Sequence, residues 1–303
     1  MQISVVIPLY NEEDSLIELH EKIISNLENF LIDYEIIFID DGSIDSSWSV
    51  IKNLCSSSKK TKGVQFLKNY GKSMALSEGF KLAKGKIVIT MDADLQDDPK
   101  EIIPLYKMIT ENNYDIVSGW KKKRYDSLIF KNLPSKLFNF AARLSSGISL
   151  NDFNCGIKAY KSDVIKEIEL TSGMHRYIPV LAKKSGFHKI AEKIVKHHPR
   201  VHGNTKYGPD RFIKGFLDLI TLSFFSRFGK RPMHFFGLFG TLILVVGFFF
   251  SIYLGIDKLF INTTGRLITE RPEFYISLAS MIIGSQFFLT GFLGELILRN
   301  SKK

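Results

Sequence analysis

The stretch IVITMDADLQDDP, residues 87–99, joins a predicted buried strand to four carboxylates and one amide. We expect the strand to span residues 86–91. Side chains alternate in extended chain, so Asp92 and Asp94 can then project to the same side. Two carboxylates with Gln96 close behind them are oxygen ligands that suit Mg²⁺ or Mn²⁺. In open α/β sheets, ligands bind at this edge, outside the carboxyl ends of the strands.

A plainer interpretation of the same stretch is a solvated acidic turn that leads into a helix beginning near Pro99. The motifs elsewhere in the chain favour the first interpretation. We therefore expect Asp92 and Asp94 to take part in chemistry, and Asp97 and Asp98 only to start the helix.

Strand-like and helix-like segments alternate on both sides of this stretch. Apolar or β-branched runs predict strands at residues 4–8, 34–43 (running into a turn), 63–68 and 114–119, and a helical period predicts helices at 13–30, 71–84 and 99–111. Asp45 or Ser46 is placed to cap the helix that follows the second strand. Strands that are almost continuously apolar and alternate with helices are typical of a mostly parallel sheet covered on both faces. The predicted fold class is α/β.

Neither of the common phosphate-binding loops is present in the sequence. No G-x-G-x-x-G follows the first predicted strand, and no G-x-x-x-x-G-K-[ST] occurs in the chain. Carboxylates instead follow successive strands: Glu12 and Glu13, Asp40 and Asp41, Asp92 and Asp94. Carboxylates accept hydrogen bonds from ribose hydroxyls and base N–H groups, and a cation can bridge them to a diphosphate. This pattern favours a nucleotide-sugar site over a dinucleotide site.

Four motifs, VVIPLYNEE, IDDGSIDSS, NYGKSMALSEG and MDADLQDDP, resemble those of the inverting family 2 glycosyltransferases, which have the GT-A fold. Later segments are similar to those of the polyprenyl-phosphate glycosyltransferases, the group that includes dolichyl-phosphate mannose synthase and the bactoprenyl glucosyltransferases. These segments are SGWKKKR, LPSKLFNFAARL, NDFNCGIKAYKSDV, MHRYIPVLAKKSGF and HHPRVHGNTKYG. The resemblance implies a GT-A type nucleotide-sugar-binding domain with a mostly parallel sheet, followed by amphipathic interfacial helices and two C-terminal transmembrane helices.

The resemblance also implies a donor site. Asp92, Asp94 and Gln96 would hold a divalent cation, Mg²⁺ or Mn²⁺, on the donor diphosphate. Asp40 would contact the base or the ribose, and Asp41 is equally compatible with such a contact and with a solvated turn. The full donor set implied is Pro8, Tyr10, Asn11, Glu12, Asp40, Asp41, Lys72, Asp92, Ala93 and Asp94.

A basic stretch at residues 119–136 precedes an apolar helical stripe at 137–148, and residues 210–228 form a second amphipathic pattern. Basic charge beside an amphipathic helix is typical of a surface that lies on anionic lipid. In the family, arginines and a serine in this region hold the acceptor phosphate. The implied acceptor residues here are Lys121, Lys131, Ser135 and Arg200. Arg200 also belongs, with Lys206, to a later loop that would close over the donor phosphates and the acceptor. Two expected arginines are lysines, which offer point charges rather than planar forks.

The chain has a net charge of +10, with 41 Lys and Arg against 31 Asp and Glu. This balance favours acidic partners such as nucleic acid, an anionic membrane or phosphorylated substrates. Residues 235–256 and 274–294 carry no charge, and about 20 such residues cross the hydrocarbon core of a bilayer. We therefore predict two transmembrane helices. Since the basic residues lie beside apolar helices rather than among aromatic side chains, nucleic acid is not an expected partner.

Basic residues flank both predicted spans: Arg227, Lys230 and Arg231 before the first, and Arg299, Lys302 and Lys303 after the second. The positive-inside rule then predicts a multi-pass protein of the cytoplasmic (inner) membrane with its catalytic domain and both termini on the cytoplasmic side. The predicted parts are a catalytic domain at 1–208, amphipathic helices at 209–233, a transmembrane pair at 234–298 and a basic tail at 299–303. Small residues in the second span would permit close packing, including a homo-oligomer: Gly284, Ser285, Gly291 and Gly294.

The predicted reaction is attack by an oxygen of undecaprenyl or dolichyl phosphate on the anomeric carbon of a UDP- or GDP-linked sugar. A phosphate monoester has a second pKa of about 6, so it is largely dianionic at neutral pH and needs no dedicated general base. Catalysis would rest on positioning the substrates and on neutralising the leaving diphosphate. The implied catalytic residues are Asp92, Asp94, Arg200 and Lys206.

The sequence bears on three alternative functions. A processive polysaccharide synthase shares the fold but carries a Q-x-x-R-W motif, and neither Trp48 nor Trp120 follows an arginine. A transferase of the same group that uses an amino sugar or an N-acetylated sugar stays open. A catalytically silent scaffold that binds nucleotide sugars is disfavoured because Asp92, Asp94 and Gln96 are all present.

Overall fold

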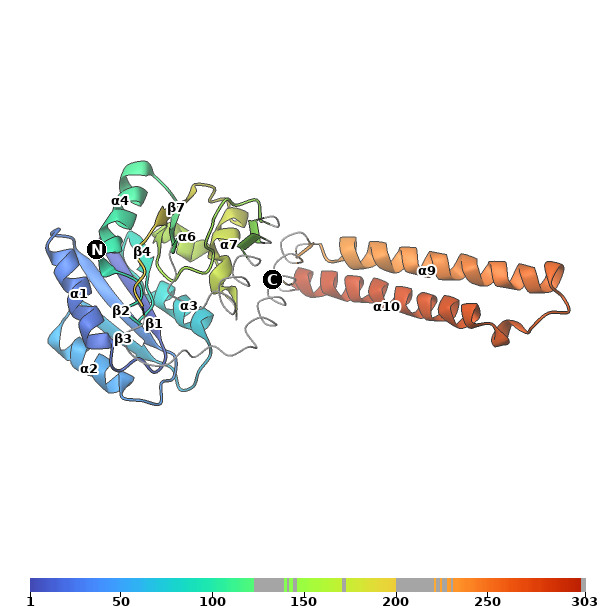
Figure 1. Cartoon of the computed structure of the whole chain (residues 1–303), viewed down its shortest axis with the longest axis horizontal. Helices are drawn as coiled ribbons and strands as arrows, with labels where there is room; N and C mark the ends of the chain where they lie inside the picture. Colours follow the sequence, from blue (N-terminus) through green and yellow to red (C-terminus); the bar gives the residue numbers. More distant parts are fainter. Residues whose placement is uncertain are drawn as a thin grey trace. The chain divides into compact units, whose positions relative to one another are not determined.

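The computed structural model describes residues 1–122, 139–140, 142–143, 146–170, 173–199, 221, 224, 228–229 and 231–300. The chain forms two compact units, Met1–Ile220 and Thr221–Lys303. The first is an α/β unit, and the described part of the second is dominated by two long helices (Figure 1). The predicted boundaries at residues 208 and 209 lie outside the described residues.

One sheet runs through the first unit. Its described strands are β1 (Ile3–Leu9), β2 (Tyr34–Asp40), β3 (Thr61–Gln65), β4 (Ile87–Thr90), β5 (Ile116–Trp120), β6 (Lys158–Lys161) and β7 (Ile190–Ile194). Their order is β3-β2-β1-β4-β6-β5-β7. Strand β6 is antiparallel to β4 and β5, and the other neighbouring pairs are parallel. The prediction of a mostly parallel sheet is confirmed, and it places the carboxyl ends of β1, β2 and β4 at one edge.

Helices cover both faces of this sheet. They are α1 (Leu16–Glu28), α2 (Ser47–Ser57), α3 (Lys72–Leu82), η1 (Pro99–Glu101), α4 (Ile102–Asn112), α6 (Ser162–Glu167), η3 (Met174–Tyr177) and α7 (Ile178–Lys184). The alternation of side chains along β1 separates two cores. Val5 and Ile7 belong to the core that includes α1, α2 and α4. Val6 belongs to the core that includes α3, α6 and α7.

The element boundaries differ from the predictions by a few residues, and two strands were missed. The predicted strand at 63–68 is β3 at Thr61–Gln65, and the predicted helix at 13–30 begins at Leu16. Strands β6 (KAYK) and β7 (IAEKI) are short and carry charged residues, so they lack the apolar run that identified the others. They are strands because the sheet supplies hydrogen-bonding neighbours, which the local pattern does not reveal.

The second unit contains α9 (Met233–Ile256), a π turn η4 (Asp257–Ile261), η5 (Ile268–Glu270) and α10 (Pro272–Asn300). Both long helices are apolar and long enough to cross a membrane, at Met233–Ile261 and Pro272–Asn300. Most of their apolar side chains are exposed, including Val246 at 64% and Leu289 at 57%. A core helix of a soluble protein would bury such residues, so this surface fits a lipid environment.

Glycines set the contact between α9 and α10. A Cβ on Gly240 would lie 2.7 Å from the carbonyl oxygen of Gly284, and a Cβ on Gly284 would lie 2.5 Å from the amide nitrogen of Leu244. Ser277 is buried and donates to the carbonyl oxygen of Gly247 at 2.6 Å. Small residues therefore bring the two backbones together within one chain. Gly284 and Gly291, which we expected to permit packing between subunits, pack on α9 of the same chain, and the homo-oligomer stays a prediction.

Candidate active site

The loop after β4 alternates buried apolar and half-buried polar side chains. Met91, Ala93 and Leu95 are buried, and the residues between them are Asp92, Asp94 and Gln96, all half-buried. The loop turns at Leu95, which has a positive φ of 58°. The amide of Gln96 donates to Asp94 Oδ1 at 3.2 Å. The structure thus brings the three predicted cation ligands to one loop at the carboxyl edge of the sheet.

Asp92 is paired with the ammonium group of Lys72, at the start of α3. Burial alone would raise the pKa of Asp92, but the charges of Lys72, Lys121 and Lys158 and the hydrogen bond from Lys72 outweigh it and lower the pKa to about 2. On its other side Asp92 faces the backbone of Gly156, where a Cβ would lie 2.4 Å from Asp92 Oδ2. The carboxylate is therefore ionised, already in contact with a cation, and held against a glycine.

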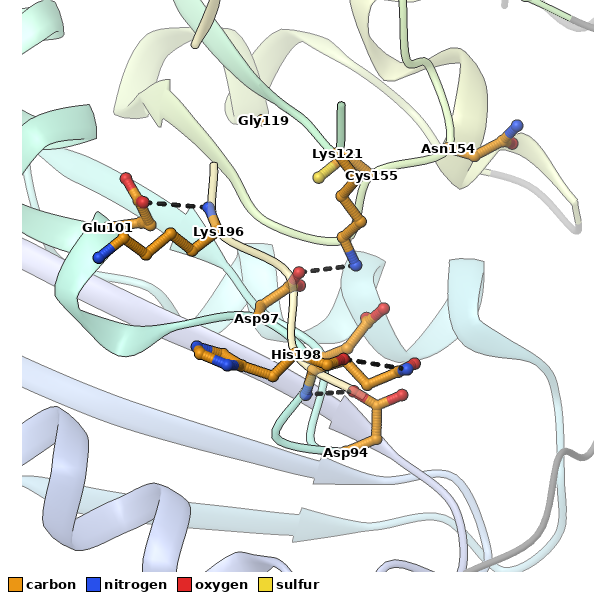
Figure 2. Close-up of polar contacts among 12 residues, drawn as sticks. Asp94, Asp97, Glu101, Gly119, Lys121, Asn154, Cys155, Lys196 and His198 are labelled. Atoms are coloured by element: carbon orange, nitrogen blue, oxygen red, sulfur yellow. Dashed lines mark hydrogen bonds and ion pairs between the residues drawn. The ribbon is translucent and has the colours of Figure 1, made fainter. Parts of the chain in front are cut away.

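Asp97 does more than start a helix, which differs from the expectation from sequence. It is 1% exposed and forms an ion pair with Lys121, whose Nζ lies 2.7 Å from Asp97 Oδ1 (Figure 2). Burial by itself would lower the pKa of Lys121, but the Asp97 carboxylate outweighs burial and raises it. Asp98 does start a helix, because its side chain accepts from the amide of Lys100 at 3.0 Å. The prediction was wrong for Asp97 and correct for Asp98.

Asp40 and Asp41, at the end of β2, accept hydrogen bonds from different groups. Asp41 accepts hydrogen bonds from the backbone amides of Tyr70, at 2.7 Å, and Gly71, at 2.9 Å. Asp40 accepts from the amide of Ser43 with Oδ1, and no described residue donates to its buried Oδ2. Burial raises the pKa of Asp41, against the effect of the two amides. Asp41 is a structural acceptor, and Asp40 retains an acceptor oxygen.

The loop after β1 is tied to the loop after β2. Pro8 lies inside β1, paired with Ile39. Asn11 accepts from the amide of Ile44 at 2.8 Å through its side chain, and its own amide donates to the Ser43 hydroxyl. Tyr10, Asn11 and Glu12 are half-buried at this edge. The structure brings these donor-site candidates close to the end of β2.

Residues 197 and 198 lie along the loop after β4. The amide of His198 donates to the carbonyl oxygen of Gln96 at 2.9 Å, and His198 Nε2 lies 3.4 Å from Asp98 Oδ2. His197 is 9% exposed, whereas the side chain of His198 is 51% exposed, so only His198 is open to solvent. The predicted residues Lys131, Ser135, Arg200 and Lys206 lie outside the described residues.

The segment NDFNCG, residues 151–156, reaches the site at Gly156, which faces Asp92; it belongs to a motif similar to one of the family, and the sequence left the role of Asp152 and Asn154 undetermined. Asp152 is 1% exposed, accepts from the amide of Asn154 at 3.0 Å, and is within 3.5 Å of the amide of Lys121. Lys158 follows on β6, is 4% exposed and donates to the carbonyl oxygen of Cys155. Burial lowers the pKa of Lys158. The sequence signal for this buried lysine is its position between the apolar residues Ile157 and Ala159, and we did not single it out.

Comparison with known proteins identifies the family. Residues 4–169, more than half of the chain, match Glycosyl transferase family 2, and the chain belongs to this family. It is 33% identical over 301 residues to dodecaprenyl-phosphate galacturonate synthase of Rhizobium johnstonii, covering 99% of this chain and 88% of that protein. It is 35% identical over 297 residues to undecaprenyl-phosphate 4-deoxy-4-formamido-L-arabinose transferase of Edwardsiella ictaluri, and the match covers 97% of this chain and 88% of that protein.

Solved structures agree on the fold. Glucosyl-3-phosphoglycerate synthase of Mycobacterium tuberculosis, in complex with Mn²⁺, UDP and its product, superposes with a TM-score of 0.57 at 22% identity over 75% of this chain and 80% of that one. The same enzyme with Mg²⁺ and UDP gives a TM-score of 0.55 at 22% identity over 72% and 79%. The first unit has the GT-A fold. Together with its two apolar helices, the similarity to transferases that act on polyprenyl phosphates indicates a membrane protein.

Proposed function

We propose that this protein transfers a sugar from a nucleotide-sugar donor to a polyprenyl phosphate and inverts the anomeric carbon. The observation that carries the proposal is an ionised Asp92, next to the half-buried Asp94, at the open edge of a GT-A sheet in a chain with two membrane-length helices. Two relatives that cover almost the whole chain are named for polyprenyl-phosphate acceptors.

The donor site would hold a divalent cation, Mg²⁺ or Mn²⁺, at Asp92, Asp94 and Gln96. The residues fit such a cation, because Asp92 is ionised and already bears the ammonium of Lys72. The described residues contain no group of three or more His, Cys, Asp or Glu side chains able to hold a metal. The remaining ligands would come from the donor diphosphate, and the cation would neutralise that leaving group.

The nucleoside would bind between the loops after β1 and β2, against Pro8, Tyr10, Asn11 and Glu12. Asp40 Oδ2 has no donor among the described residues and is suited to a base or ribose N–H or O–H group. Asp41 would act indirectly, because its oxygens already accept the amides of Tyr70 and Gly71.

The acceptor phosphate would supply the nucleophile. Its second pKa of about 6 leaves it dianionic at neutral pH, so no side chain has to remove a proton. Lys131, Ser135, Arg200 and Lys206 remain the predicted phosphate contacts. The assignment of Lys121 weakens, because a phosphate would have to compete with the buried carboxylate of Asp97 for its ammonium group.

The orientation in the membrane is part of the proposal. Basic residues flank both spans, so the catalytic unit and both termini would face the cytoplasm and the loop between α9 and α10 would lie outside. A cysteine introduced at Thr264, in that loop, should react with a membrane-impermeant maleimide in intact cells. If that cysteine reacts only after the cells are lysed, the orientation is the opposite of the one proposed.

Transfer is tested with the full chain in detergent, polyprenyl phosphate and radiolabelled UDP- and GDP-sugars, including a uronic acid and amino sugars. We expect lipid-linked radioactivity that is lost with EDTA and restored by Mg²⁺ or Mn²⁺. Asp94→Asn should lower the rate at least about a thousandfold, as expected for loss of a charge contact to the leaving group. Asp163→Asn, an exposed carboxylate on α6, is the matched control.

Three outcomes would contradict the proposal. Nucleotide-sugar binding without transfer to any lipid phosphate would indicate a scaffold. Extension of a glycan by many sugars would indicate a processive synthase. An active Asp94→Asn variant would remove the predicted cation site.

A further inference from the structure

Three lysines act electrostatically on Asp92, and they differ in exposure. Lys158 is 4% exposed and lies within β6. The side chain of Lys121 is 10% exposed and is committed to Asp97. The side chain of Lys72 is 28% exposed, similar to that of its partner Asp92 at 30%. Lys72 is therefore the cation that solvent and ligands can reach.

The position of Lys72 is set by the end of the neighbouring strand. Asp41 accepts the amides of Tyr70 and Gly71, which directly precede Lys72. Gly71 has a φ of 91°, a left-handed conformation that favours glycine, and α3 begins at the next residue. The backbone at Lys72 is thus anchored, so any displacement of its ammonium would come from rotation of the side chain.

Lys72 occupies one of the two carboxylate oxygens with which Asp92 could hold a metal. Its ammonium contacts Asp92 Oδ1, and the carboxylate faces Gly156, where an added Cβ would lie 2.4 Å from Oδ2 and 2.8 Å from Oδ1. An ammonium and a divalent cation on one carboxylate oxygen repel each other at short range. A divalent cation on Asp92 therefore favours departure of the Lys72 ammonium from the same carboxylate.

We propose that Lys72 is the resident counter-cation of Asp92 in the metal-free enzyme, and that its ammonium moves from Asp92 to the donor diphosphate when a divalent cation binds. This inference rests on the proposed function, because it takes Asp92 as a metal ligand. Lys72 would weaken binding of the metal alone and strengthen binding of the metal together with a nucleoside diphosphate. The cation and the donor would then bind cooperatively.

The test measures binding rather than activity. The full chain in detergent is titrated with Mn²⁺, first alone and then with UDP or GDP, and free Mn²⁺ is followed by electron paramagnetic resonance. Lys72→Met should bind Mn²⁺ alone about tenfold more tightly than the wild type, since one charged hydrogen bond no longer competes. With the nucleotide present, the same variant should bind Mn²⁺ about tenfold more weakly, because the diphosphate loses its lysine.

Two variants control for charge and folding. Lys72→Arg keeps a cation at Asp92 and should bind Mn²⁺ alone as weakly as the wild type. Lys81→Met removes a lysine from the same helix α3, where it pairs with Glu78 at the surface, and should change neither affinity. Melting temperatures of all three variants establish that the fold is retained.

The outcomes separate the inference from the proposed function. If Lys72→Met binds Mn²⁺ alone no more tightly than the wild type, or if neither protein binds Mn²⁺, Lys72 is not a counter-cation that metal displaces. If nucleotide-dependent Mn²⁺ binding survives in Asp92→Asn, the proposed metal site itself fails, whatever Lys72 does.

Discussion

At the end of β2, Asp40 and Asp41 are 0% and 4% exposed, whereas at the end of β4 the side chain of Asp92 is 30% exposed and Asp94 is half-buried. The two strands are parallel members of one sheet, separated only by β1. Their acidic ends are nevertheless used differently. The carboxylate of Asp41 holds backbone amides, and the carboxylate of Asp92 holds a side-chain cation.

The difference comes from the segment that covers each strand end. After β3 the chain continues alongside the end of β2, where the amide of Phe66 donates to the carbonyl oxygen of Asp40. It approaches Gly42 so closely that a Cβ there would lie 2.5 Å from the backbone of Lys68. The backbone of Gly156 approaches Asp92 from one side, and 30% of the Asp92 side chain nevertheless remains exposed. A carboxylate at a strand end therefore becomes a binding group only where the following chain leaves it open.

The largest expected effect concerns Asp97, which follows β4 but is buried like the β2 pair. Asp97→Ala should lower the free energy of unfolding by about 3–5 kcal/mol, because Lys121 would remain as an unpaired buried charge. Chemical denaturation in detergent measures this loss. Asp97→Leu combined with Lys121→Met should recover much of it, and a fully stable single variant would show that the pair does not hold the loop.

Gly156→Ala probes the open end of β4 directly. The added methyl group would lie 2.4 Å from Asp92 Oδ2, so the carboxylate has to shift. A displacement of this size should lower kcat about a hundredfold, as misplacement of a reacting group by about 1 Å does. Gly255→Ala is the control, because its methyl group would contact nothing within 4 Å. An unchanged rate would mean that the position of Asp92 is not critical.

Asp41→Ala probes the closed end of β2. Loss of the acceptor for the amides of Tyr70 and Gly71 should cost about 1–3 kcal/mol of stability. Asp94→Asn should leave stability near that of the wild type while transfer is lost, so the two aspartates separate stability from activity. Denaturation curves and initial rates on the same samples provide the comparison, which fails if Asp41→Ala is as stable as the wild type.

The smallest effect is the pH dependence of stability. The pKa shifts of Asp92, after β4, and Asp41, after β2, have opposite signs. The folded pKa of Asp92, about 2, lies below its ordinary value of about 3.8, so its stabilisation is complete above that value and is lost as the pH falls through 2. Burial raises the pKa of Asp41, so its contribution is present at low pH and is lost as the pH rises through its folded pKa. Between pH 5 and about 2, melting temperatures should fall more steeply for the wild type than for Asp92→Asn.

Much of the site follows from local sequence pattern, and the errors have a common cause. The alternation in MDADLQ agrees with the burial in the structure, where Asp92, Asp94 and Gln96 are half-buried between buried apolar residues, although β4 ends at Thr90 and Leu95 has a positive φ. Their role as cation ligands stays a prediction. Asp97 continues the same acidic run, and nothing in its neighbours indicates a buried ion pair. Lys158 was overlooked because a single lysine in a short strand is usually solvent-exposed.

By itself, the sequence determined the α/β class, the two membrane-length helices and the position of the acidic loop, since these depend on hydrophobic periodicity and length along the chain. The tertiary structure decided which carboxylates can bind a ligand and which hold groups of the protein itself. The pair of Lys72 with Asp92 joins positions 20 residues apart, and the bond from Tyr70 to Asp41 joins positions 29 apart. Such contacts depend on how the segments after β2, β3 and β4 meet at the sheet edge, which a pattern of neighbouring residues does not encode.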